Sequence, residues 1–153
     1  MRILTTLTVA GVLVAGSAQA QSIMADHAWA RATTPSQTSG GIFISLMDMG
    51  PDDALVGARS PIADTLQVHE TVEEAGVMKM RPVPSLPLPS MATVELKPGG
   101  YHVMVMGLKQ QLKPGDTFPV TLSFAHAAPM TVSVTVEAAG ASAMPGMPGM
   151  KMP

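Results

Sequence analysis

Proline and glycine interrupt this chain at short intervals, and their spacing constrains the fold more than any other feature. Each occurs fourteen times in 153 residues, and no clean helical period extends beyond about ten residues. Apolar and alternating runs that favour β-structure recur between these breaks. We expect strands at 41–47, 65–72, 76–81, 101–106, 117–125 and 130–137. Short strands separated by proline and glycine turns predict an all-β sandwich or barrel.

One segment, 82–89, differs from the expected strands because it holds four prolines in eight residues. Proline has no backbone N–H and does not fit a central strand. We therefore expect an extended connection between sheets at this point. Two turns, Lys97-Pro98-Gly99-Gly100 and Lys113-Pro114-Gly115-Asp116, lead into the strands expected at 101–106 and 117–125.

The first twenty residues have the pattern of a secretory signal peptide. Arg2 supplies a positive charge, a mostly apolar stretch follows, and Ala18-Gln19-Ala20 is an A-x-A cleavage site. We expect cleavage near Ala20 and a soluble protein exported to a bacterial periplasm; a retained N-terminal anchor is the alternative. The predicted domain covers 21–138, and the segment 139–153, rich in methionine, proline and glycine, is predicted to be disordered.

Charge and cysteine content exclude several classes of function. Nine basic and eleven acidic residues give a net charge of −2, and loss of Arg2 with the signal peptide makes it −3. Nothing in this balance supports binding to nucleic acid or to an anionic membrane surface. The chain has no cysteine, so packing rather than disulfides must stabilise it.

Four residues form the strongest candidate site: His69, Met80, His102 and Met104. Two imidazoles and two thioethers are soft, uncharged ligands, which suit Cu(I) better than Zn²⁺, Mg²⁺ or Ca²⁺. Residues two apart on a strand share a face, so His102 and Met104 can approach one ion. On this chemistry alone, metal binding and a purely structural role remain comparable explanations.

The other histidines and methionines have simpler interpretations. A lone histidine is usually structural or solvated, and we interpret His27 and His126 in that way. Methionine fills irregular cores, and five are interpreted as packing or surface residues: Met47, Met49, Met91, Met106 and Met130.

The spacing of the four candidate ligands resembles the signature of the periplasmic copper chaperone family PCu(A)C, H(M)-x10-M-x21-H-x-M. Both intervals are intact, and the resemblance extends over about 23–137. Matching segments surround the candidate ligands and the start of the mature chain: Ala28-Trp29-Ala30-Arg31-Ala32, Gly76-Val77-Met78-Lys79-Met80-Arg81-Pro82, Leu96-Lys97-Pro98-Gly99-Gly100-Tyr101-His102-Val103-Met104 and Gly107-Leu108-Lys109.

This resemblance implies a cupredoxin-like Greek-key β-sandwich with one exposed Cu(I) site. It also implies delivery of copper to the CuA or CuB centre of a haem–copper cytochrome oxidase, beside a thioredoxin-like Sco-type partner. The chain departs from the family at Asp48-Met49-Gly50, where relatives often carry an asparagine-containing turn, and at Glu70, which replaces an optional methionine. Neither change removes a ligand.

The C-terminal segment adds thioethers that the signature does not include. We hypothesise that Met144, Met147, Met150 and Met152 form a flexible second copper-binding element. Together with the histidines, this element could also hold Cu(II). The alternative is an unstructured end that binds nothing.

Three classes of function remain to be compared. A non-enzymatic copper carrier is the leading hypothesis. The second class is a copper-dependent enzyme or an electron-transfer protein. A blue-copper electron carrier would need a cysteine thiolate, and redox catalysis would need a stable Cu(II) state, which the thioethers oppose. The chain has no cysteine, and no nucleophilic motif is visible. Passive copper buffering would use identical ligands, so the sequence does not separate it from delivery.

Overall fold

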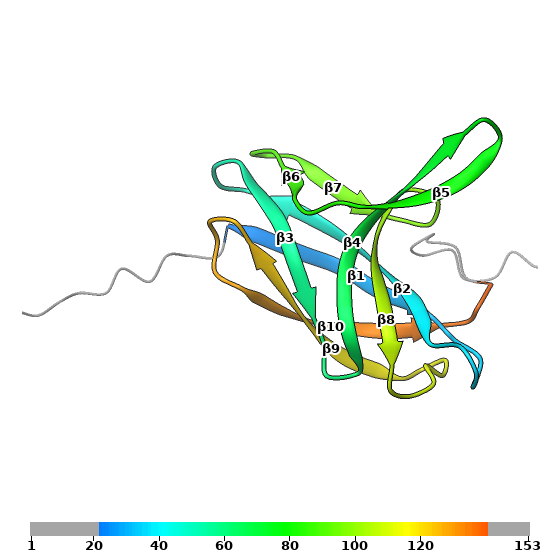
Figure 1. The fold of residues 1–153 in the computed structure, drawn as a ribbon. Helices are drawn as coiled ribbons and strands as arrows, with labels where there is room; N and C mark the ends of the chain where they lie inside the picture. The colour runs from blue at the N-terminus through cyan, green and yellow to red at the C-terminus, as the bar shows by residue number, and fades with distance from the viewer. Residues whose placement is uncertain (1–21, 141–153) are drawn as a thin grey trace, which may run out of the picture.

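The computed structural model describes residues 22–140, which form ten β-strands (Figure 1). No helix in this range is long and apolar enough to cross a membrane. The strands are β1 (Ile23–Arg31), β2 (Ser39–Asp48), β3 (Asp53–Arg59), β4 (Ala63–Glu74), β5 (Val77–Pro82), β6 (Leu86–Leu88), β7 (Thr93–Leu96), β8 (Tyr101–Leu108), β9 (Thr117–Phe124) and β10 (Met130–Glu137). All six strands expected from the sequence are present, and the all-β prediction is confirmed.

Hydrogen bonding joins the strands in the order β5-β4-β8-β2-β1-β10-β9-β3-β6, with β7 paired to β2. A further contact between β3 and β4, at Ala58 and Leu66, brings distant parts of this order together. The sheet therefore folds over itself, and in Figure 1 β3, β4 and β8 lie in front of β1, β2 and β10. Neighbours that are not consecutive in sequence, such as β8 beside β2, give the sandwich its crossed connections.

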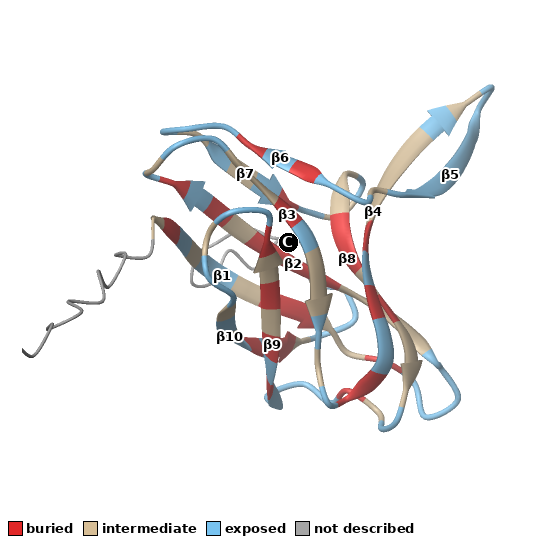
Figure 2. Ribbon diagram, turned by 60° about the vertical axis from the view of Figure 1, so that its left-hand side comes forward, coloured by how far each residue is buried: buried red, intermediate tan, exposed pale blue. Residues whose placement is uncertain are grey.

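The core lies between the two layers and is built mainly from alternate residues of the strands other than β5. Buried and non-buried positions alternate along β9, and Figure 2 shows this alternation as bands of colour on the strand. The inward residues are large and aliphatic or aromatic, including Leu46, Val103, Val105, Leu122 and Val134. Burying each such side chain contributes about 1.5–3 kcal/mol, which stabilises a domain without disulfides.

A β-hairpin made of β4 and β5 projects from the body of the sandwich (Figures 1 and 2). Glu74 pairs with Val77, so the connecting loop has two residues, Ala75 and Gly76, with φ angles of 51° and 77°. Two positive φ angles are typical of the type I′ turn that matches strand twist. All of β5 is exposed, and Glu74 forms ion pairs with Lys79 and Arg81 on the hairpin.

The proline-rich segment is only partly an open connection, which corrects the expectation for 82–89. Within it, Leu86–Leu88 forms the short strand β6, which pairs with β3. β6 stands at one end of the strand order, where one side of the backbone has no strand partner. An end strand tolerates proline for that reason, and Pro87 is exposed between two buried leucines.

Candidate metal centre

Register places the four candidate ligands on the outer face of the sheet formed by β5, β4 and β8. His69 lies opposite His102 across β4 and β8, and Met80 lies opposite Thr71 across β4 and β5. Met104 follows two residues after His102 on β8. Their neighbours Val68 and Val103 are buried in the core. Strand alternation therefore directs the candidate ligands outward together, as the sequence predicted for His102 and Met104.

The two histidine rings are stacked. Their centroids lie 6.1 Å apart with 21° between the planes. The ring of Phe43 lies on the other side of His102, at 6.4 Å, and Trp29 packs against Phe43 at 4.6 Å. This row of rings crosses β4, β8, β2 and β1, and it leaves the His102 residue only 5% exposed.

A backbone carbonyl fixes one nitrogen of each imidazole. His102 Nδ1 lies 3.2 Å from the Gly100 oxygen, and His69 Nδ1 lies 3.3 Å from the Gln67 oxygen. A carbonyl accepts only, so in each neutral ring Nδ1 carries the proton and donates. The lone pair is then on Nε2, and such orientation by a second hydrogen bond is typical of metal-binding histidines.

His102 Nε2 is buried and has no hydrogen-bond partner among the described residues. An unsatisfied buried polar atom costs about 1–3 kcal/mol and calls for a physical reason. A metal ion at this position would supply the missing interaction.

Burial lowers the pKa of His102 below its ordinary value, and the nearby His69 acts in the same direction. The Gly100 carbonyl opposes this effect by raising the pKa. The net result is a ring that stays neutral at lower pH than a free histidine, which keeps Nε2 available to a metal.

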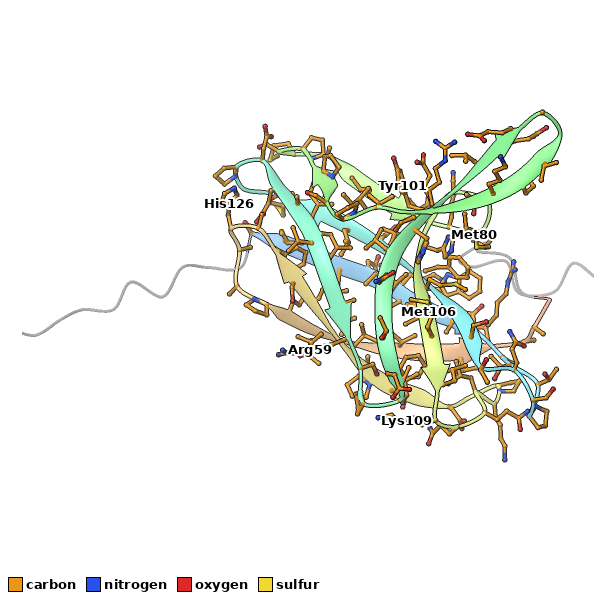
Figure 3. The ribbon with its side chains drawn as sticks, viewed as in Figure 1. Arg59, Met80, Tyr101, Met106, Lys109 and His126 are labelled. Atoms are coloured by element: carbon orange, nitrogen blue, oxygen red, sulfur yellow. The ribbon has the colours of Figure 1, made fainter. Side chains whose placement is uncertain are left out.

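Met80, His102 and Met104 line one surface cavity of about 280 Å³. Thr71, Phe43 and Arg31 contribute to its walls, and the Arg31 guanidinium lies 5.7 Å from the Phe43 ring centre. Figure 3 shows Met80 near the base of the projecting hairpin, and this residue is 59% exposed. The cavity is therefore open to solvent on the side of Met80.

The remaining candidates lie elsewhere or outside the described residues. Figure 3 shows His126 on the opposite side of the molecule from Met80. His27 lies beside Trp29 and 3.9 Å from a Glu137 oxygen. The tail methionines fall outside the described residues: Met144, Met147, Met150 and Met152. The same holds for the predicted signal peptide, residues 1–20.

Phe43, Trp29, Arg31 and Thr71 belong to the site but were not assigned to it from the sequence. The alternation in 41–47 indicates the face of the strand on which Phe43 lies, but it does not indicate which neighbouring strand the Phe43 ring contacts. Pairing of β2 with β8 brings Phe43 to His102 from 59 positions away. Trp29 and Arg31 lie on β1, a strand that the sequence pattern did not predict.

The arrangement suits a soft cation. The four candidates offer two neutral nitrogens and two thioether sulfurs, a set that favours Cu(I) among biological metals. Within 22–140, no three histidine, cysteine, aspartate or glutamate side chains gather in a way that could hold a metal ion. The described residues thus provide no hard-ligand cluster of the kind that Ca²⁺ or Mg²⁺ requires.

Comparison with known proteins gives one family and several similar structures. The family model described as "Putative lipoprotein LpqE-like" matches residues 23–136. "Putative lipoprotein Lxx21020" of Leifsonia xyli subsp. xyli (strain CTCB07) is 36% identical over 121 residues, covering 78% of this chain and 72% of that protein.

Two solved structures resemble the fold. The copper-bound PCuAC domain from PmoF2 has a TM-score of 0.66 and 25% identity, covering 76% of this chain and 93% of that one. The solution structure of CuI-DR1885 from Deinococcus radiodurans has a TM-score of 0.60 and 32% identity, covering 78% and 81%. These likenesses confirm the predicted cupredoxin-like sandwich.

Proposed function

Because the chain belongs to the LpqE-like, PCu(A)C family, we propose that it is a copper chaperone that binds Cu(I) at His69, Met80, His102 and Met104. Two of its structural neighbours are solved with copper bound. The protein is a carrier rather than an enzyme in this proposal. It delivers copper to the CuA centre of a haem–copper cytochrome oxidase, and CuB is a second destination of the same kind.

The observation that carries the proposal is the buried, unpartnered Nε2 of His102. The His102 residue lines the same cavity as Met80 and Met104, and the stacked His69 ring adds a second nitrogen. Backbone carbonyls hold both rings before any metal arrives. A preorganised ligand loses less freedom on binding.

The ligand types also favour transfer over permanent retention. Cu(I) binds thiolates more tightly than neutral thioethers, and this chain has no thiolate to offer. An acceptor with cysteine ligands, such as an apo CuA domain, can therefore withdraw the ion. A thioredoxin-like Sco-type protein is the expected companion in that step.

The proposed location is the periplasm. The A-x-A motif ending at Ala20 supports export, and the relative from Leifsonia xyli carries a lipoprotein name. Signal peptide cleavage near Ala20 would release the carrier to the compartment where CuA domains are exposed.

The C-terminal methionines are assigned to the same copper handling in this proposal. β10 ends at Glu137, opposite Arg31 of β1, and Arg31 lines the cavity of His102 and Met104. The chain therefore leaves the described domain beside the site. Met144, Met147, Met150 and Met152 are proposed to capture Cu(I), and to hold Cu(II) together with the histidines when copper is supplied in that form.

A transfer experiment tests the function. The secreted form of the chain is loaded with one Cu(I), mixed with an apo CuA domain under reducing conditions, and separated for copper analysis. We expect most of the copper on the CuA domain, with and without a reduced Sco-type protein present. Copper that stays with the chain would favour passive buffering instead, and failure to load would contradict copper binding itself.

A further inference from the structure

A second group of methionines gathers on the outer face of the sheet, away from the ligand quartet. Met24 of β1 lies directly opposite Met47 of β2. Met49 follows two residues after Met47, and its amide donates to the Ser22 oxygen at 2.8 Å, so pairing with the β1 side continues there. Register thus places three thioethers in two adjacent rows.

These three side chains are open to solvent. Met24 is 57% exposed, Met47 is 40% and Met49 is 54%, whereas Ile23, Leu46 and Asp48 beside them in the chain are buried. Directly opposite residues have Cβ atoms about 5 Å apart, and diagonal neighbours about 7–8 Å. Methionine has three flexible side-chain bonds, so the three sulfurs can converge on one ion.

The choice of residue argues against a simple apolar patch. Among the described residues, the exposed large hydrophobic side chains are six methionines and two valines. No leucine, isoleucine or phenylalanine belongs to that set, although each would serve a contact surface equally well. What methionine adds is the sulfur atom.

Charge and shape on this face favour a cation. Met24, Met47, Asp26 and Ser45 line a surface hollow of about 470 Å³. Ser45 of β2 pairs with Asp26 of β1 on one side and with Glu95 of β7 on the other. This row of side chains is adjacent to the row that holds Met24 and Met47. Both acids are exposed, and their negative charge stabilises a nearby positive ion without replacing the soft ligands.

We propose that Met24, Met47 and Met49 form a second Cu(I) site, a three-thioether centre separate from the histidine–methionine quartet. Met47 stands six residues along β2 from Gly41, which pairs with Met104. At a rise of about 3.3 Å per residue, the two centres are about 20 Å apart. They lie on the same outer face, and each can hold one ion independently.

The test uses the secreted chain labelled with ¹³C in its methionine methyl groups, titrated with Ag(I) as a redox-inert analogue of Cu(I). Measurements are made in a M80L/M104L background, which removes the sulfurs of the quartet. We expect the methyl signals of Met24, Met47 and Met49 to move together with one midpoint. The further change M47L should raise the midpoint for Met24 and Met49 at least tenfold.

Two residues in the same spectrum act as controls. Met78 is 59% exposed and, with Met80 replaced, is the one thioether left on β5. The methyl signal of Met78 should shift only at an Ag(I) concentration at least tenfold higher. Met130, half-buried on β10, should stay unmoved. If the three methyl signals stay still, or respond separately at the concentration that moves Met78, the proposal is wrong and the patch is a contact surface. The result is read from the methyl groups of Met24, Met47 and Met49 alone, so the two imidazoles that remain of the quartet do not contribute to it.

Discussion

The imidazole rings of His69 and His102 lie stacked at 6.1 Å, with one ring from each of two paired strands. Each ring donates through Nδ1 to the carbonyl oxygen of the residue two positions before it in the chain. The two Nε2 atoms therefore carry the free lone pairs; that of His102 is buried, and this residue lines a cavity together with Met80 and Met104. Cross-strand pairing, rather than a local sequence motif, builds this half of the site.

Protonation of His102 should occur at lower pH than in a free histidine, because burial lowers its pKa. In the unfolded chain the same ring has its ordinary pKa of about 6.5. As the pH falls, the unfolded state therefore binds a proton before the folded state does. The free energy of unfolding keeps its full value above the unfolded-state pKa and declines as the pH falls toward the folded-state pKa. The slope for one proton is at most about 1.4 kcal/mol per pH unit.

Histidine NMR signals of the metal-free protein, followed against pH, check this expectation directly. Urea unfolding at pH 7.5 and pH 5.5 measures the stability change. A His102 signal that titrates at or above the ordinary value would contradict the burial argument.

Loss of either thioether of the quartet should weaken Cu(I) binding while leaving the fold intact. Met80→Leu and Met104→Leu keep most of the side-chain volume and remove the sulfur. We expect each to reduce affinity at least tenfold, equivalent to about 1.4 kcal/mol, in competition with a colorimetric Cu(I) chelator. Met78→Leu is the matched control, since Met78 has the same 59% exposure on the same strand. Equal losses in all three variants would refute the ligand assignment.

The packing of Phe43 against His102 should respond to a methyl group added on β2. A Cβ at Gly41 would lie 3.3 Å from the Phe43 ring, whereas a Cβ at Gly40 meets nothing closer than 3.7 Å. Gly41→Ala should therefore shift the ring, change the emission of Trp29 and lower Cu(I) affinity by about tenfold, as changes behind a ligand commonly do. Gly40→Ala should leave the Phe43 ring, the Trp29 emission and the Cu(I) affinity unchanged. Identical behaviour of the two variants would exclude a supporting role for Phe43.

Stability, in contrast, should depend on Gly107. Its φ is +70°, and an added Cβ would lie 2.6 Å from Asp64 Oδ2 and 2.9 Å from Asp64 Cβ. Gly115 also has a positive φ but open space around it, so Gly115→Ala should cost only the conformational penalty of about 1–2 kcal/mol. Gly107→Ala should lower the free energy of unfolding by more than this, as measured by urea unfolding. A smaller loss at Gly107 than at Gly115 would show that the Asp64 contact relaxes freely.

Removal of the C-terminal segment tests its assignment to copper handling. A chain that ends at Ala139 retains all ten strands and loses four thioethers. We expect fewer bound Cu(I) ions per chain and slower transfer to an apo CuA domain. Unchanged stoichiometry, affinity and transfer rate would mean that the four methionines have no part in the function.

The strands that could be predicted from sequence are those with a long alternating or apolar run, such as β4 and β10. β1 was missed because its alternation breaks at Asp26 and His27, where the register shifts and His27 has a φ of 46°. β6 and β7 span three and four residues, too few for a periodic pattern to stand out.

For the site, the shared face of His102 and Met104 could be predicted from the sequence, and the strand register confirms it; the ligand types stay a prediction. The burial of His102 could not be predicted, because it depends on Phe43 and on the pairing of β2 with β8. The methionine triad was missed for the same reason. Met47 and Met49 were interpreted as packing or surface residues, and only the pairing with β1 adds Met24 to them.

The projecting hairpin gives the four proposed ligands unequal mobility. β4 and β8 are held on both sides by other strands, whereas β5 is the last strand of its order and pairs with β4. Opening this outer strand breaks fewer hydrogen bonds than any rearrangement of the central ones. Such a fluctuation withdraws one sulfur, that of Met80, and leaves two nitrogens and the Met104 sulfur where they are. A bound ion would then have a vacant coordination position that faces solvent. The first ligand of an incoming acceptor can bind there before the two nitrogens and the Met104 sulfur dissociate.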